Sequence, residues 1–317
     1  MKSVASAPGK IILFGEHFVV HGTKAVLCSI DKRITATSQF VDERIVRIRS
    51  SLGEAEMDID SLDNLENVQQ KFMRPFFHIA KKTLMENPIK QGIEITIESE
   101  IPAGVGLGSS SSACVAVTAS VNGLFRKLSS EEVVKIAIQA ERTIFEQNSG
   151  ADSSVSTFGG LVSYDLKSGF QPIPSRNDLS FIISNSAQVH NTQDVVRQVR
   201  QFKEKNEDLF NRLCKEEMDI INNAITSLRE NNLNKLGFLM LKNHELLKQI
   251  GVSTEKIDLL IKEAKKTAYG AKITGAGGGG CIIALVDNSN IKDTLDNLRK
   301  ISDCFIAKID YDGLQYV

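Results

Sequence analysis

The sequence predicts an α+β protein with two domains. Short strand-like segments occur in both halves of the chain, whereas long amphipathic helical segments are concentrated in the second half. The chain has 317 residues, which is enough for two domains of ordinary size. Pro172 and Pro174, in the segment GFQPIPSRNDL, mark the best candidate for a domain boundary. We therefore expect an N-terminal domain over residues 1–175 and a C-terminal domain over residues 176–317.

The first half of the chain mixes strands and helices. We expect strands at residues 11–14, 25–30, 34–40, 44–48, 92–99 and 161–164. The segment GIEITIES is the clearest of these, because Ile93, Ile95 and Ile97 share one face and polar residues occupy the other. Helices are expected at residues 67–86, 110–125 and 130–146, and a polar loop is expected in the segment NSGADSSVSTFGG.

The second half is richer in helices. The segment LSFIISNS predicts a strand, and amphipathic helices are expected at residues 192–230, 232–250 and 254–268. The segment AKITGAGGGGCIIALVD predicts a strand, a glycine loop and a second strand. A helix near residues 290–300 and a strand near 304–311 complete an α+β half.

The composition argues against several classes of protein. Lys and Arg number 38 and Asp and Glu 39, so there is no electrostatic reason to expect nucleic acid or an anionic membrane as partner. The five cysteines form no CxxC pair, which argues against a zinc ribbon or a thioredoxin-type site. The start lacks a secretory signal, and no apolar run is long enough to span a bilayer. We expect a soluble, cytoplasmic protein; its oligomeric state, including a homodimer, is left open.

The segment IPAGVGLGSSSSACVAV carries the strongest local signal. Its glycines, Gly104, Gly106 and Gly108, do not have the G-x-G-x-x-G spacing of a dinucleotide fold, and no strand ending in an acid follows. A Walker loop is excluded, because the one Gly-Lys pair, Gly9-Lys10, is not followed by Ser or Thr. Glycines still let the backbone approach an anion, and the following helix start adds N–H donors. Serine hydroxyls can add donors or bind a hard cation such as Mg²⁺. The segment therefore predicts an anion site.

Two other segments carry related chemistry. In APGKIILFGEHFVVHG, Lys10 stands at the start of a strand and Glu16-His17 just after its end; zinc binding by the two histidines is disfavoured, because Phe18 occupies the position of the Glu in HExxH. In KITGAGGGG, the glycines predict close packing of backbone against a ligand or another loop. Between these segments, Glu141 on a helix could hold a metal, and Asp152 on a loop could accept a proton.

The order of these motifs resembles the GHMP small-molecule kinases. PGKIILFGEH, PAGVGLGSSSS and KITGAGGGG correspond to the three signature motifs of that family, and the resemblance extends from about residue 7 to residue 284. It implies an N-terminal domain like domain 2 of ribosomal protein S5, a ferredoxin-like C-terminal half and an active site in the cleft between them. Within the family, APGKIILFGEHFVVHG and NSGADSSVSTFGG look like the mevalonate kinases, with the phosphomevalonate kinases as the nearest alternative.

The resemblance also implies roles for individual residues. ATP and Mg²⁺ would be bound, with the ATP phosphates lying along Gly104, Gly106, Leu107, Gly108, Ser109, Ser110, Ser111 and Ser112. Ser110 and Glu141 would hold the Mg²⁺, and Ser109 or Ser111 is the alternative hydroxyl. Asp152 would accept the proton of the mevalonate 5-hydroxyl, and Lys10 would lie beside both groups.

The same resemblance places the substrate. The carboxylate and 3-hydroxyl of mevalonate would be held by Glu16, His17, Thr192 with its neighbours His190 and Asn191, Gly275 and Ala276. Two other classes of protein remain as alternatives, a non-catalytic ligand-binding member of the family and an NAD-dependent oxidoreductase. The presence of both Lys10 and Asp152 argues against the first, and the glycine spacing against the second.

Overall fold

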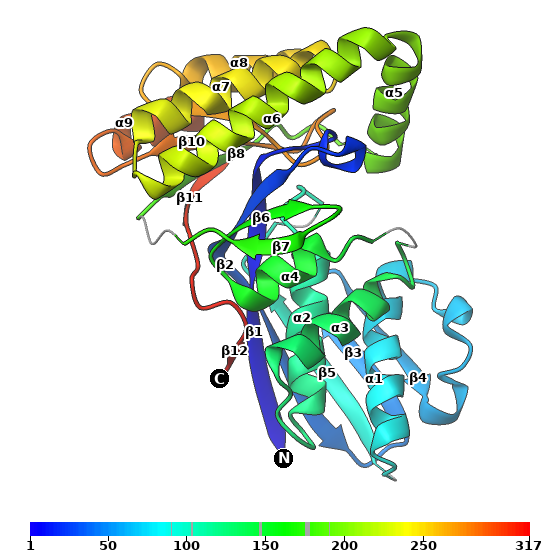
Figure 1. Ribbon diagram of the computed structural model, residues 1–317. Helices are drawn as coiled ribbons and strands as arrows, with labels where there is room; N and C mark the ends of the chain where they lie inside the picture. Colours follow the sequence, from blue (N-terminus) through cyan, green and yellow to red (C-terminus); the bar gives the residue numbers. More distant parts are fainter. Residues whose placement is uncertain (90, 103, 146–147, 175–177, 190) are drawn as a thin grey trace.

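Two β-sheets organise the chain, one in each half of the molecule (Figure 1). The structure is a computed structural model, and it describes residues 1–317 except 90, 103, 146–147, 175–177 and 190. The expected α+β class is confirmed. The expected domain boundary between residues 175 and 176 lies outside the described residues.

The first sheet has eight strands in the described part of the chain. Its order is β12-β1-β2-β5-β3-β4, and β6 pairs with both β2 and β7. The strands are β1 (Lys2–Phe14), β2 (Ala25–Val41), β3 (Ile45–Ser50), β4 (Gly53–Asp58), β5 (Gly92–Ser99), β6 (Leu161–Asp165), β7 (Gly169–Pro172) and β12 (Gln315–Tyr316). Only β3 and β5 are parallel among these pairings. The strands expected at 25–30 and 34–40 are one continuous strand, and β4 and β7 were not expected.

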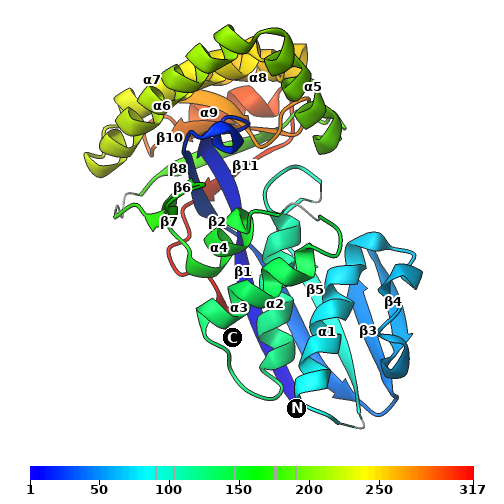
Figure 2. The same ribbon diagram turned by 45° about the vertical axis from the view of Figure 1, so that its right-hand side comes forward.

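Four helices in the described part of this half lie beside the sheet, and one of them, α3, packs mainly against the other three (Figure 2). They are α1 (Arg74–Glu86), α2 (Ser109–Asn122), α3 (Ser130–Glu141) and α4 (Ala151–Phe158), and short 3₁₀ turns cover Val19–His21, Ile59–Ser61, Leu65–Asn67 and Lys71–Met73. Every residue of α2 from Ser111 onward is buried, because its small side chains allow close packing on all sides.

The expectation of a polar loop after α3 is wrong, because α4 occupies most of that segment. The N-cap of α4 is Gly150, which adopts a left-handed conformation with φ of 77°. Its serines are buried and hydrogen-bonded: Ser153 donates to Glu141, and Ser156 pairs with Ser112. A serine-rich composition therefore did not mean exposure here, since the hydroxyls find partners inside the protein.

The second sheet has the strand order β11-β8-β10-β9, and all of its pairings are antiparallel. Its strands are β8 (Ser180–Asn185), β9 (Gly270–Thr274), β10 (Cys281–Val286) and β11 (Cys304–Lys308). The helices are α5 (Thr192–Lys205), α6 (Glu207–Arg229), α7 (Leu233–Gln249), α8 (Glu255–Ala264) and α9 (Ile291–Arg299). Strands and helical segments follow one another in the order β-α-β-β-α-β, which is the ferredoxin-like arrangement that we expected.

One expected helix of this half is divided. Residues 192–230 form α5 and α6, which are separated at Asn206, a residue with non-helical angles of φ −137° and ψ 47°. The Asn206 side chain donates to the carbonyl of Phe202 and thereby ends α5. Beyond β11 the chain returns to the first half, where β12 pairs with β1 (Figure 1).

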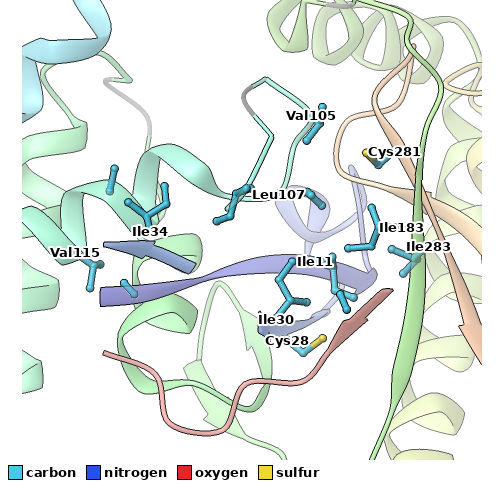
Figure 3. Close-up of a cluster of buried hydrophobic side chains, with 14 of the residues drawn as sticks. Ile11, Cys28, Ile30, Ile34, Val105, Leu107, Val115, Ile183, Cys281 and Ile283 are labelled. Carbon is cyan, nitrogen blue, oxygen red and sulfur yellow. The ribbon is translucent and has the colours of Figure 1, made fainter. Parts of the chain in front are cut away.

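A continuous hydrophobic core connects the two sheets. Figure 3 shows Val105 and Leu107 in the same cluster as Ile11 of β1, Ile183 of β8 and Cys281 of β10. No helix in the described part of the chain is long and apolar enough to cross a membrane. The loops that carry the sequence motifs are thus attached to a common core.

Candidate active site

A cavity of about 1230 Å³ lies where loops from both halves meet. Residues from all three motifs line it, together with the two predicted acids: Lys10, Glu16, His17, Gly104, Gly106, Gly108, Ser109, Ser110, Ser111, Glu141, Asp152, Thr192, Gly275 and Ala276. Three predicted residues, Leu107, Ser112 and Asn191, do not line it, and Asn191 instead caps the start of the helix that begins at Thr192. His190 lies outside the described residues.

The glycine–serine loop (residues 104–112) supplies the start of helix α2. Gly108 is the N-cap, with φ of 74°, and no described side chain caps the N–H groups that follow. A side chain at this position would clash, because a Cβ on Gly108 would lie 2.7 Å from Cγ of Lys10. The positive end of the helix dipole therefore borders the cavity, where it favours an anion such as a phosphate.

Leu107 and Ser112 hold this loop in place. Leu107 is buried in the core, and its carbonyl accepts a 2.9 Å hydrogen bond from the N–H of Lys10. The Ser112 hydroxyl donates to the carbonyl of Pro8 at 2.8 Å. These two hydrogen bonds attach the loop to β1. Leu107 and Ser112, which were predicted to contact the phosphates, therefore hold the loop in position instead of lining the cavity.

A second helix start meets the same cavity. Gly150 is the N-cap of α4, and Asp152 lies in the first turn. Nζ of Lys10 is 3.2 Å from Oδ2 of Asp152, and the exposed fractions of the two side chains are 5% and 34%. The buried amino group of Lys10 therefore contacts a carboxylate that is partly exposed to the cavity. Asp152 was expected on a loop, and the structure places it on a helix.

Glu141 has a different set of partners. The hydroxyl of Ser111 donates to its Oε1 at 2.7 Å, while Ser153 and Asn148 donate to its Oε2 at 2.8 and 2.7 Å. Burial raises the pKa of Glu141, the nearby Asp152 raises it further, and the hydrogen bonds oppose the shift. No basic side chain among the described residues forms an ion pair with it. A buried carboxylate with neutral donors alone is suited to receive a cation.

Within the glycine–serine loop, Ser111 is the serine whose hydroxyl contacts Glu141. The resemblance, in contrast, implies Ser110 as the metal ligand. Ser110 also lines the cavity. Both serines therefore border the cavity, and the assignment of Ser110 as a metal ligand remains a prediction.

The third motif meets the first at the edge of the cavity. Nε2 of His17 lies 2.7 Å from the carbonyl oxygen of Ala276, so this nitrogen must carry the proton. Burial lowers the pKa of His17, which favours the neutral ring. Gly277 and Gly279 allow close contact with other loops, because a Cβ on either would lie 2.4 Å from a backbone oxygen, of Val252 and Gln188 respectively. These glycines thus serve loop packing.

One wall of the cavity was not predicted from the sequence. Residues that line this side come from the first 3₁₀ turn, β6, α5 and α6: Val19, Val20, His21, Tyr164, Val196, Val199, Arg200, Lys203, Glu204 and Glu207. Nζ of Lys203 lies 3.2 Å from Nδ1 of His21, and the rings of Phe18 and Phe210 are 5.6 Å apart. The helical spacing of 196, 199 and 203 indicates a common face, but spacing alone does not say what that face contacts.

Family models match both halves of the chain. The GHMP kinases N terminal domain matches residues 72–160, and the GHMP kinases C terminal domain matches residues 224–302. The chain belongs to the GHMP kinase family, as its motifs indicate.

The relatives within that family are more specific. A mevalonate kinase of Pyrococcus furiosus is 33% identical over 307 residues, which cover 91% of this chain and 90% of that protein. The crystal structure of the Methanococcus jannaschii mevalonate kinase has a TM-score of 0.87 and 30% identity, covering 97% of this chain and 98% of the other. A phosphomevalonate kinase of Streptococcus pneumoniae, at 17% identity and a TM-score of 0.74, covers 98% of this chain and 100% of its own; it shares the fold.

Proposed function

We propose that this chain transfers the γ-phosphoryl group of ATP to the 5-hydroxyl of mevalonate, forming 5-phosphomevalonate in the mevalonate pathway of isoprenoid biosynthesis. The observation that carries the proposal is the contact between Lys10 and Asp152 beside two helix starts. Relatives that share about a third of their sequence over nearly the whole chain are mevalonate kinases, which supports this choice of substrate.

The residues of the site divide the reaction between them. The hydroxyl oxygen of the substrate forms a bond to the γ-phosphorus, the bond from that phosphorus to the β–γ bridging oxygen breaks, and ADP leaves. Asp152 takes the hydroxyl proton. Lys10 stabilises the negative charge that develops on the attacking oxygen, and it holds Asp152 in place. The N–H groups at the start of α2 bind the phosphates.

Mg²⁺ fits the acidic position near the phosphates. Glu141 and a hydroxyl of Ser110 or Ser111 would hold the ion, which would neutralise phosphate charge. The described residues contain no group of three or more His, Cys, Asp or Glu that could hold a metal by itself. A single carboxylate with one hydroxyl agrees with how kinases bind Mg²⁺, since one or two carboxylates share the ion with the substrate phosphates.

A panel of substrates tests the proposal. ADP release is measured with mevalonate, 5-phosphomevalonate, galactose and homoserine at equal ATP and Mg²⁺. We expect kcat/KM to be highest for mevalonate. Faster turnover of 5-phosphomevalonate would assign the chain to the second step of phosphorylation instead. ATP binding without turnover of any of the four would favour a non-catalytic member of the family.

A further inference from the structure

A buried ion pair lies behind the substrate end of the cavity. Glu16 follows β1 and lines the cavity, and its Oε1 accepts a hydrogen bond from Nζ of Lys272 on β9. The exposed fractions of the two side chains are 1% and 0%. Lys272 also donates to the carbonyl of Ile273, and these two residues begin the third motif. The pair therefore joins the first motif to the strand that carries the third.

A second carboxyl group completes this cluster. Glu217 of α6 is fully buried, and Nδ2 of Asn243 on α7 donates to its Oε2 at 2.6 Å. Glu16 Oε2 and Glu217 Oε1 are both buried and have no hydrogen-bond partner among the described residues. One oxygen of Glu16 is thus occupied by Lys272, and the other is buried without a partner in the described part of the chain, although Glu16 is among the residues that line the cavity.

Burying the charges of Glu16 and Lys272 lowers the stability of the fold, which suggests that the ion pair serves the function of the site. Taking two charges out of water costs several kcal/mol for each ion before their attraction is counted, so an apolar pair of similar size is often at least as stable. Burial alone would leave Glu16 protonated, since it raises the pKa of this carboxyl, and Lys272 opposes that shift. The lysine therefore favours an ionised acceptor at the cavity wall.

We propose that Lys272 is a positioning residue that keeps Glu16 ionised and in place, so that Glu16 Oε2 accepts a hydrogen bond from the hydroxyl of mevalonate that does not react. The inference rests on the proposed function, and it adds a residue that has no contact with the cavity. Glu217 is the third member of the cluster, and its charge competes with Glu16 for Lys272.

A double-mutant cycle tests the role of Lys272. The variants are Lys272→Met, Glu16→Gln and the combination of the two, and KM and kcat are measured for mevalonate and ATP separately. Without Lys272, Glu16 should take up a proton and resemble Gln. We expect Lys272→Met to raise the KM for mevalonate roughly 10-fold, to change the KM for ATP less than about 3-fold, and to have no further effect in the Glu16→Gln background.

The ion pair between Arg33 and Asp310 provides a matched control. It is largely buried and joins distant parts of the chain, but neither residue lines the cavity. Arg33→Met should lower the melting temperature and leave the KM for mevalonate unchanged. Equal effects of Lys272→Met in both Glu16 backgrounds, or parallel changes in both KM values, would overturn the positioning role.

The pH profile of Glu217→Gln gives a second measurement that does not require Lys272→Met to fold. Burial raises the pKa of Glu217 to about 7, the charge of Glu16 adds to the shift, and the hydrogen bond from Asn243 and the charge of Lys272 oppose it. Cys214, on the same helix, also interacts with Glu217, and the neighbouring titratable groups are His17 and His244 beside Lys272 and Lys10 beside Glu16. Ionised Glu217 draws Lys272 away from Glu16, so the KM for mevalonate should rise between pH 6 and 8 in the wild type.

Glu217→Gln should abolish that rise, and an identical profile in the two proteins would overturn the proposal. Failure of the role of Lys272 can be distinguished from failure of the proposed function. A chain that does not turn over mevalonate contradicts the proposed function before the cycle begins. A chain that does, but shows additive variants and unchanged profiles, contradicts the role of Lys272 alone.

Discussion

Two buried glutamates border the same cavity, and their partners differ. Glu141, beside the glycine–serine loop, accepts hydrogen bonds from two serines and an asparagine. Glu16, which follows β1, is paired with the buried amino group of Lys272. Burial raises the pKa of both carboxyl groups. At Glu16 the charge of Lys272 opposes this shift, whereas at Glu141 hydrogen bonds from neutral side chains oppose it.

The difference indicates how the protein divides its tasks. A carboxylate with neutral partners gains most from a cation that arrives with the ligand, as Mg²⁺ does with ATP. A carboxylate that already has its own cation needs none from the ligand and is left to accept hydrogen bonds. Lys10 and Asp152 lie between the two, where the proposed transfer takes place.

The strongest change to this arrangement is the substitution of Asp152 by Asn. Asn keeps the shape of the side chain but cannot take the hydroxyl proton, so kcat should fall roughly 10³-fold. Steady-state kinetics give kcat, and titration with ATP should show nearly unchanged binding. Unchanged turnover would remove Asp152 from its role as base, and a loss of ATP binding would indicate a role at the phosphate end.

Glu141→Gln tests the phosphate end. The amide cannot supply the negative charge, so we expect the Mg²⁺ concentration for half-maximal rate to rise roughly 100-fold, at little change in the KM for mevalonate. Glu16→Gln is the matched control, and it should show the opposite pattern. If both variants changed the same parameter, the division of tasks between the two glutamates would be wrong.

The raised pKa of Glu141 adds a dependence on pH. Mg²⁺ binds the ionised carboxylate, so the Mg²⁺ requirement of the wild type should increase as pH falls. A carboxyl whose pKa is higher in the folded state stabilises the fold at low pH, and that contribution is lost as pH rises through the folded pKa. The stability difference between Glu141→Gln and wild type should therefore move in favour of the variant with rising pH, as melting temperatures across pH 5–8 would show.

Gly108→Ala tests the geometry of the glycine–serine loop. The residue has φ of 74°, and a Cβ would meet Lys10. We expect a loss of about 1–3 kcal/mol in the free energy of unfolding and a rise of roughly 10-fold in the KM for ATP, since misplacing a binding group costs one or two orders of magnitude.

Gly22→Ala is the control for backbone strain alone. Gly22 has φ of 92°, but a Cβ there would have nothing within 4 Å. Urea denaturation should show a loss of stability of about 1 kcal/mol, without the change in the KM for ATP. Equal effects of the two variants on that KM would mean that contact with Lys10 is unimportant.

Much of the site could be predicted because each motif carries its chemistry locally. Glycines followed by serines indicate an anion site at a helix start in any fold, and Gly108 is in that position. Asp152 was identified as a candidate base, yet its helix was missed. The serines around it indicated a loop, and only the folded structure supplies the partners that bury Ser153 and Ser156.

Lys272 shows what a single sequence does not reveal. A lone charge between apolar residues of a strand indicates a buried charge that needs a partner. That partner, Glu16, is 256 residues away in the sequence. Strand periodicity says which face a residue occupies, and it does not identify what packs there. The cavity wall formed by α5 and α6 was missed for the same reason, because an amphipathic face is compatible with a core as well as with a binding site.

The smallest expected effect distinguishes the serines near Glu141. Ser111→Ala removes one of three donors to the carboxylate, a loss of about 1 kcal/mol that should raise the Mg²⁺ requirement roughly 5-fold. Ser110→Ala is the matched variant. If Ser110 is the metal ligand, as the motif implies, its loss should raise the Mg²⁺ requirement more than the loss of Ser111. The reverse order would mean that the hydroxyl in contact with Glu141 is the one that binds the ion.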